Sequence, residues 1–321
     1  MKTTIPDALK ADIPANKLGK LFAATPVIMT VIATMLAGLA SSEMTRAQYD
    51  RSLAAQQQSK AGDQWSFFQA KKLRSALQRN TLDMVESTTE VYPISESALT
   101  GIVAKTQAQA VLESEAGKQA LAALQAGKLP KIPPSPVVDA QVKTALDALR
   151  DAKPEADVLA LIAPISTTTL AEALQAAEDY ALIADKTTAP FSQAIDAIEK
   201  EIAAKRALGQ PNPDEALIVK VEGRNFTAAR LRFNSLRYDS EARLNQAVAN
   251  IYELQVRKSN VSAERHHNRS QRFFFGMLAA QMGVIIATFA MAAKQRNLLW
   301  SLAAGAGVVA IAFALYVYLY V

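Results

Sequence analysis

Three uncharged runs, each long enough for one membrane-spanning helix, constrain this chain more than any other feature of its sequence. They cover residues 21–40, 273–293 and 298–321. A helix crosses the hydrocarbon layer of a bilayer with about 20 apolar residues, which each run supplies. Residues 158–171 are the best competitor, but this stretch is shorter and contains Pro164, which indicates a soluble helix or a turn. The alternative is that the three runs are buried helices of a soluble protein.

The ends of the last two runs carry the residues expected at a membrane surface. Long basic side chains there can extend their charges to the lipid headgroups. Trp300 and the series Tyr316, Tyr318 and Tyr320 lie at opposite ends of the third run, as interfacial aromatic belts do. The residues that we expect at the headgroups are Arg265, His266, Arg269, Arg272, Lys294, Arg296 and Trp300.

The first run also has a feature of a cleaved signal peptide, because the small residues Gly38 and Ala40 lie near its end. However, the segment before it is long and contains Asp7 and Asp12, which is unusual for a signal peptide. We therefore expect an uncleaved membrane anchor.

The last two runs are separated only by Lys294–Asn297, which predicts a tight antiparallel hairpin. Small residues recur along both runs at a spacing of four, and such stripes let helix backbones approach closely in lipid. The amide of Gln281, in the middle of the second run, requires a partner inside the bundle or in an oligomer. The expected contact residues of the spans are Gly276, Ala279, Gln281, Gly283, Ala287, Ser301, Gly305 and Gly307.

Basic residues in the short segments outside the runs predict the orientation in the membrane. With three spans, the N-terminal tail (residues 1–20) and the hairpin loop share one side, and residues 41–272 lie on the other. Short basic segments mark the cytoplasmic side, whereas long domains translocate largely regardless of charge. We weight the short segments above the basic residues that precede the second run, and expect a cytoplasmic N-terminus and a periplasmic middle domain. The basic residues of the short segments are Lys2, Lys10, Lys17, Lys20, Lys294 and Arg296.

Two long segments without interior proline flank the middle of the chain, residues 41–92 and 221–272. An apolar stripe through Trp65, Leu73, Leu77 and Met84, with Phe68 beside it, predicts a helix in the first segment. We expect each helix to continue into its neighbouring span, and the two to pair antiparallel as a stalk with coiled-coil character. The expected contact residues of the stalk are Trp65, Phe68, Phe226, Phe233, Arg237 and Tyr238.

Residues 93–220 are predicted to form a helical head at the far end of the stalk. A helix is expected from Ser95 to about Ala126, followed by an extended proline-rich strap, residues 128–136. Further helices are expected over residues 138–152, 155–163, 167–186 and 190–208, before a second linker at residues 209–213. The predicted fold is therefore an all-α membrane protein with three transmembrane helices, an antiparallel helical stalk and a helical head.

The residue types needed for most catalytic and metal sites are missing from the sequence. The chain has no cysteine, which excludes disulfides, thiolate zinc sites and a cysteine nucleophile. No glycine-rich phosphate loop occurs. The only histidines, His266 and His267, are adjacent on a helix and point about 100° apart, so they do not chelate one metal together. We expect no catalytic residue, no cofactor and no metal.

The segment from Arg224 to Arg272 has ten basic and four acidic residues, interleaved with aromatic side chains. One interpretation is that these arginines pair with acids on neighbouring helices and with anionic headgroups near the membrane. The other is that they form a docking face for another subunit. A nucleic-acid partner is not expected in a periplasmic stalk. The predicted partners are the lipid bilayer and either further copies of the chain or other membrane protein subunits.

Two stretches resemble a bacterial family of three-span membrane proteins labelled only as a domain of unknown function. The first is the sequence DQWSFFQAK at residues 63–71, and the second covers residues 237–267, including Arg265-His266-His267 before the C-terminal hairpin. The resemblance implies the same three-span layout and a bacterial inner membrane. It implies no activity and no catalytic residue. The insertion over about residues 95–220 is longer than expected for that family.

Three functions are consistent with the sequence. The first is a non-catalytic, membrane-anchored helical scaffold or accessory subunit that acts through helix–helix interaction. The second is a channel or transporter component, in which Gln281, Thr288 and Thr30 face a pore made by associated spans. The third, an enzyme that uses carboxylates in the head, has the least support because no acid is paired with a base. We favour the scaffold.

Overall fold

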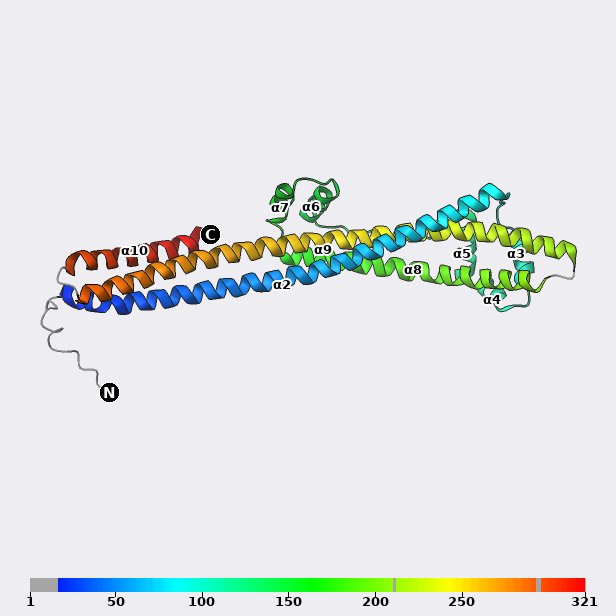
Figure 1. The fold of residues 1–321 in the computed structure, drawn as a ribbon. Coiled ribbons are helices and arrows are strands. Elements are labelled where there is room, and N and C mark those ends of the chain that lie inside the picture. The colour runs from blue at the N-terminus through cyan, green and yellow to red at the C-terminus, as the bar shows by residue number, and fades with distance from the viewer. Residues whose placement is uncertain (1–16, 210–211, 293–295, 321) are drawn as a thin grey trace. The chain divides into compact units, whose positions relative to one another are not determined.

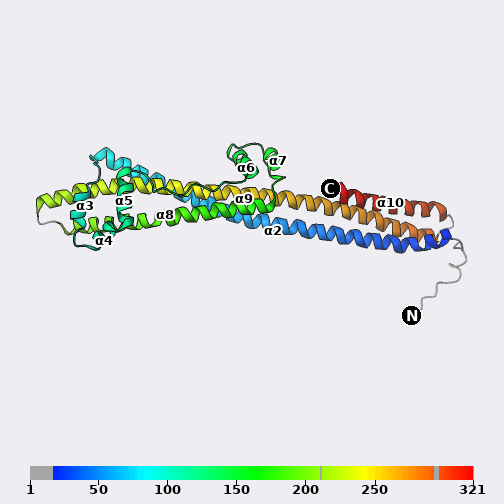
Figure 2. The same ribbon diagram turned by 180° about the vertical axis from the view of Figure 1, so that it is seen from behind.

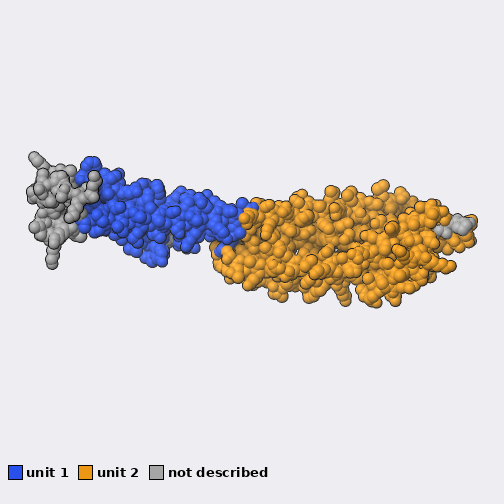
Figure 3. All heavy atoms as spheres, turned by 90° about the horizontal axis from the view of Figure 1, so that it is seen from below, with its two compact units in different colours: residues 1–55, 257–321 blue, residues 56–256 orange. Residues whose placement is uncertain are grey.

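A computed structural model describes residues 17–209, 212–292 and 296–320, and the regular structure in this part of the chain is entirely helical (Figure 1). The chain divides into two compact units (Figure 3). Unit 1 contains residues 1–55 and 257–321, and unit 2 contains residues 56–256.

Two long helices run through most of the chain. Helix α2 extends over Lys17–Thr88 and helix α9 over Pro213–Ala292. Each continues without a break from an apolar run into a polar segment, which confirms the predicted continuity. Helix α9 begins at Pro213 rather than at residue 221, because proline fits the first turn of a helix. The Asn212 side chain accepts a hydrogen bond from the Asp214 N–H at 3.0 Å and caps this start.

In unit 1, the apolar parts of α2 and α9 pack together with α10, which extends over Arg296–Tyr320. Helices α2 and α9 run antiparallel in this bundle. The Ser270 Oγ of α9 donates a hydrogen bond to the Ala40 carbonyl of α2 at 2.7 Å. These three helices are long and apolar enough to cross a membrane. The buried residues of the bundle are Met29, Ala33, Leu36, Ala40, Phe273, Ala280, Ala287, Ala290, Trp300, Ala303, Ala310 and Val317.

In unit 2, helix α8 lies along α9 instead of forming a separate head (Figure 1 and Figure 2). It extends over Thr167–Leu208. Near its start, the Leu170 carbonyl accepts a hydrogen bond from the Gln255 Nε2 at 3.3 Å. Near its other end, the Thr227 Oγ1 lies 3.3 Å from the Glu199 Oε1. The predicted head at the far end of the stalk is therefore wrong, because the insertion buries its apolar face on α9.

The predicted break between residues 186 and 190 is also wrong, since α8 continues through Pro190. A proline inside a helix removes one backbone hydrogen bond and normally bends or ends the helix. On both sides of Pro190, however, α8 buries apolar side chains, among them Ala184, Phe191, Ile195 and Ile198. Burial of this face offsets the lost hydrogen bond.

The single helix predicted for residues 95–126 is three helices: α3 (Glu96–Val103), α4 (Gln107–Glu113) and α5 (Glu115–Ala126). Lys105 has a φ of +65°, which interrupts the chain between α3 and α4. The Ser114 Oγ accepts the Gly117 N–H at 3.1 Å and starts α5. A Cβ at Gly117 would lie 1.9 Å from the Val111 carbonyl oxygen, so only glycine fits this junction. The three helices pack on Ile195, Ile198, Ile202, Phe226 and Phe233.

Helices α6 (Ala140–Arg150) and α7 (Glu155–Ile162) form a second core with the start of α8 and with Leu254 of α9. Together, α7 and α8 are long and apolar enough to form one bent span, since they meet at an angle of 100°. Their apolar residues Val158, Ile162 and Leu170 are buried within unit 2, however. Burial in the protein leaves them unavailable to lipid.

Tyr252 joins α8 to α9 and makes the stability of unit 2 sensitive to alkaline pH. Its hydroxyl donates to the Glu178 Oε1 at 2.8 Å. Burial and this carboxylate raise the pKa of Tyr252 from 10.0 to about 12. Because the pKa of Tyr252 is higher in the folded than in the unfolded chain, its protonated hydroxyl stabilises the folded state below pH 10. This contribution is lost as the pH rises through 12.

We therefore expect the thermal midpoint of the wild-type protein to fall more steeply between about pH 10 and 12 than that of Tyr252→Phe. Circular dichroism in detergent at a series of pH values measures this difference. Tyr49→Phe, at a tyrosine that is 68% exposed, is the matched control and should follow the wild type. Parallel curves for all three proteins would contradict the prediction.

Candidate functional site: helical interaction surfaces

Three of the predicted small residues of the spans lie at close helix contacts in unit 1. A Cβ at Gly283 would lie 2.4 Å from the Met29 Cε, and one at Gly307 would lie 2.6 Å from the Met29 Sδ. A Cβ at Gly276 would lie 3.4 Å from a methyl carbon of Leu36. The glycines therefore allow α9 and α10 to approach Met29 of α2 more closely than larger residues would.

The other predicted residues of the spans divide between the inside and the outside of the bundle. Ala287 is buried beside Ala303 of α10, and Ala279 is partly buried. Ser301, Gly305 and Gln281 are exposed. Small residues spaced by four form two stripes on α10, Ser301 with Gly305 and Ala303 with Gly307, and only the second stripe faces the bundle.

Large apolar side chains lie on the outside of the bundle. Met35 is 65% exposed, Phe289 66% and Val308 67%. The interior is formed mostly by alanine and glycine, and its larger buried side chains are Met29, Leu36, Phe273, Trp300 and Val317. This distribution is the opposite of a water-soluble helix bundle, which buries its largest apolar residues.

The end of the bundle near the polar parts of α2 and α9 contains most of the predicted headgroup residues. The His266 Nδ1 lies 2.5 Å from the Glu43 Oε2, which links α9 to α2. Arg265 is exposed, and Arg269 and Arg272 are half-buried. Trp300 is buried against Ala287, Ala290 and Ala303 rather than exposed at a surface. Lys294 and the side chain of Arg296 lie outside the described residues.

In unit 2, α2 and α9 pair antiparallel through polar contacts. The Trp65 Nε1 donates to the Glu253 Oε1 at 2.8 Å, and the Ser75 Oγ donates to the Ser235 carbonyl at 2.8 Å. Phe68 packs edge-on against Trp65, with the ring centroids 5.4 Å apart. Trp65 therefore contacts α9 through a hydrogen bond, whereas the ring contact of Phe68 is with Trp65 of the same helix.

Ion pairs continue this contact along the two helices. The Lys72 Nζ lies 2.5 Å from the Asp239 Oδ1, and this ammonium group lowers the pKa of Asp239. The Arg232 guanidinium lies 2.7 Å from Glu86. Exposed pairs of this kind contribute little energy each, but they fix which residues of the two helices lie opposite one another.

Arg237 and Tyr238, both predicted contact residues, lie together in a cluster of cations. The Tyr238 ring centroid is 5.4 Å from the Lys71 Nζ, 5.9 Å from the Arg74 Cζ and 4.5 Å from the Arg237 Cζ. Glu241 forms ion pairs with both Lys71 and Arg237. Arg237 thus pairs with an acid of its own helix. The first interpretation of the basic segment, pairing with acids on neighbouring helices, holds instead for Arg230, which lies 3.5 Å from Glu199 of α8, and for Arg232, which pairs with Glu86 of α2. Phe226 and Phe233 are core residues, 0% and 1% exposed.

The apolar stripe predicted to pair α2 with α9 faces the other way. Leu73 is 62% exposed, Leu77 54% and Met84 68%. We call these three residues the outer face of α2. Lys72 and Ser75, which lie beside Leu73 in the sequence, make the contacts with α9 instead. Apolarity alone could not reveal this, because the inner contact of α2 is largely polar.

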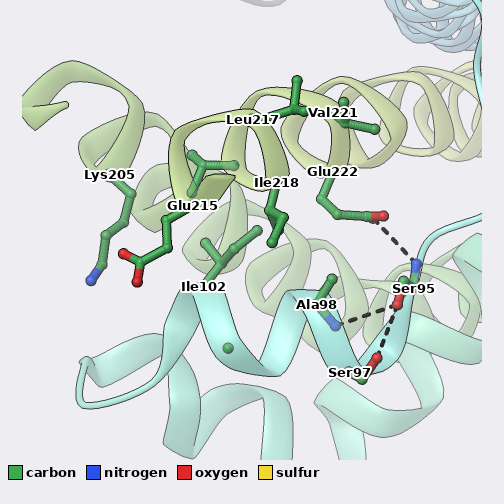
Figure 4. A pocket seen from close by; sticks show the side chains of 12 residues that line it. Ser95, Ser97, Ala98, Ile102, Lys205, Glu215, Leu217, Ile218, Val221 and Glu222 are labelled. Carbon is green, nitrogen blue, oxygen red and sulfur yellow. Dashed lines mark hydrogen bonds between the residues drawn. The ribbon is translucent and has the colours of Figure 1, made fainter. Parts of the chain in front are cut away.

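A cavity of about 790 Å³ lies between α3 and the first turns of α9 (Figure 4). Ile102, Leu217 and Ile218 form its apolar wall. Ser95 and Glu222 hold the start of α3 beside it: the Ser95 N–H donates to the Glu222 Oε2 at 3.2 Å, and the Ser95 Oγ accepts the Ala98 N–H at 3.3 Å. No three His, Asp or Glu side chains in the described part of the chain are placed to hold a metal ion.

A family described as a domain of unknown function (DUF4337) matches residues 20–147. The match includes the first apolar run and the segment at residues 63–71, whereas the second stretch of the resemblance, residues 237–267, lies outside it. No curated protein and no solved structure matches the chain. From its first apolar run to residue 147, within α6, this chain is thus similar to a family whose description assigns no function.

Proposed function

We propose that the chain is a membrane-anchored helical scaffold, or an accessory subunit of a membrane protein complex, that acts through helix–helix contacts and performs no catalysis. The observation that carries the anchoring is the outward placement of Met35, Phe289 and Val308 on the apolar helices. Exposing apolar surface to water costs about 25 cal/mol for each Å². A lipid environment removes this cost and leaves close helix packing to the small residues.

The scaffold part of the proposal rests on how α2 and α9 continue beyond the apolar bundle. They form an antiparallel stalk whose polar contacts hold its two helices in register. Most side chains of unit 2 pack against one another or form ion pairs between its own helices. The outer face of α2 is exposed and could bind a partner helix. Contact with other helices is therefore the activity that this surface supports best.

We place the chain in a bacterial inner membrane, with a cytoplasmic N-terminus and unit 2 in the periplasm. The lysines of residues 1–20 and the basic hairpin loop support this orientation. Arg265, Arg269 and Arg272 are then positioned at the level of the headgroups, where they favour anionic lipid.

The cysteine-free sequence gives a direct test of anchoring and orientation. In intact inner-membrane vesicles or spheroplasts, Ser135→Cys should react with a membrane-impermeant thiol reagent applied from the periplasmic side. Gln295→Cys, in the hairpin loop, should react only after the membrane is permeabilised. The reverse pattern would contradict the orientation, and release of the protein by alkaline carbonate would contradict anchoring.

A channel or transporter component formed by associated spans is the second candidate. The observation in its favour is the exposed amide of Gln281 in the middle of the second span. By contrast, Thr288 donates its hydroxyl hydrogen bond to its own helix, at the Val284 carbonyl, as does Thr30 at the Pro26 carbonyl. Unchanged ion flux in proteoliposomes containing the protein would eliminate this candidate.

A further inference from the structure

The outer face of α2 lies on the side of the helix opposite α9. Contacts with α9 come from Lys72, Ser75 and Glu86. With 3.6 residues per turn, Leu73, Leu77 and Met84 point roughly 155° away from the average direction of these three. In unit 2 they are covered by no other helix, since each is more than half exposed.

The outer face belongs to a wider strip of exposed residues that follows a seven-residue repeat, and from here on the outer face includes Ala70 and Asn80. Ala70, Leu77 and Met84 are spaced by seven, and Leu73 and Asn80 occupy the second position of the same repeat. This is the spacing with which two helices pack side by side in a coiled coil. All five residues are exposed, and none is charged.

The charged residues of this part of α2 lie on other sides of the helix than the outer face. Lys71, Lys72 and Glu86 form ion pairs with α9, and Arg74 lies against the Tyr238 ring. Arg79 and Asp83 lie at least about 100° from the centre of the outer face. The face is therefore an uncharged strip along a helix whose other sides carry both signs of charge.

We propose that the outer face of α2 packs against the same face of a second copy of this chain, in a parallel two-helix contact. The inference rests on the proposed anchoring, because copies held in one membrane by the same spans necessarily run in the same direction. A two-fold axis along the membrane normal then places each residue of the face opposite the same residue of the second copy.

A second copy fits this face because such a two-fold contact must be self-complementary. A charged residue on the axis would meet its own charge, and the strip contains none. Leucine meets leucine at positions 73 and 77, and methionine meets methionine at position 84. Asn80 fits as well, because an amide can both donate to and accept from an identical amide.

The cysteine-free chain allows the contact to be tested by disulfide formation in native membranes. Leu73→Cys and Leu77→Cys should each give a covalent dimer under mild oxidation, because facing residues of the repeat bring their Cβ atoms close to the roughly 4 Å that a disulfide needs. Arg79→Cys is the matched control, since it is exposed on another side of the same helix and should remain monomeric.

A second variant tests the contact without relying on disulfide geometry. Leu77→Glu alters a side chain that is already 54% exposed, so folding of unit 2 should be preserved. In the Leu73→Cys protein it should lower the cross-linked fraction about tenfold or more, because two like charges would be buried face to face. Arg79→Glu in the same protein should leave the cross-linked fraction unchanged.

Absence of cross-links at positions 73 and 77, or equal cross-linking at position 79, would overturn the proposal. Cross-links to a foreign protein alone would overturn the choice of a second copy. Carbonate extraction of the same membranes distinguishes this failure from failure of anchoring. A retained protein without cross-links refutes only the α2 contact, whereas a released protein refutes the anchoring.

Discussion

Replacing Phe226 with alanine should lower the free energy of unfolding of unit 2 by about 3–5 kcal/mol. The side chain is 0% exposed and belongs to the core that joins α3, α4, α5 and α8 to α9. Its removal leaves a cavity that the surrounding helices cannot fill completely. Chemical unfolding in detergent, followed by the fluorescence of Trp65 in a Trp300→Phe background, measures the change within unit 2.

Phe67→Ala is the matched control, because the same side chain is removed from a position that is 55% exposed. This change should lie within about 0.5 kcal/mol of the wild type. Equal losses for the two variants would show that the insertion does not pack on α9 as described. The comparison therefore tests the correction of the predicted head.

Replacing Gly283 with leucine should disrupt the three-helix bundle of unit 1. A Cβ at this position would already lie 2.4 Å from the Met29 Cε, so the Met29 side chain would have to move, and the further carbons of leucine would press on the neighbouring helices. Overpacking of this kind costs about 1–3 kcal/mol. The expected result is a lower thermal midpoint in detergent and faster cleavage by protease at the ends of the spans.

Gly305→Leu tests the same substitution on the exposed side of α10. A Cβ there has no neighbour within 4 Å, so the bundle should keep its wild-type stability. Both positions were expected at helix contacts from their spacing alone. Equal sensitivity at the two positions would mean that Gly305 also lies in a contact, for example between copies of the chain.

The helical architecture of this chain could be predicted well from its sequence. Uncharged run length identified the three apolar helices, because a charge inside hydrocarbon is costly and its absence over about 20 residues is easily recognised. The absence of proline from residues 221–272 indicated the continuity of α9. Trp65 contacts α9 as the sequence predicts, whereas its neighbour Phe67 is 55% exposed, so aromatic character alone did not identify the inner side of α2.

The arrangement of the remaining helices could not be predicted, for physical reasons. The stripe through Leu73, Leu77 and Met84 has the pattern of an inner face, but hydrogen bonds and ion pairs on the other side of α2 determine its contact with α9. Pro190 indicated the start of a separate helix after a break, yet burial of α8 against α9 keeps the helix continuous. Both errors arise where tertiary contacts outweigh local sequence preference.

The intact mass of the complex, after gentle extraction from the native membrane, tests the central claim most directly. A scaffold that acts through helix–helix contact predicts an assembly with at least two copies of the chain, either alone or with foreign subunits in fixed ratio. Native mass spectrometry would then give a mass above that of the single 34.6 kDa chain. A clean single-chain species of 34.6 kDa, extracted under conditions that preserve other membrane complexes, would contradict the account.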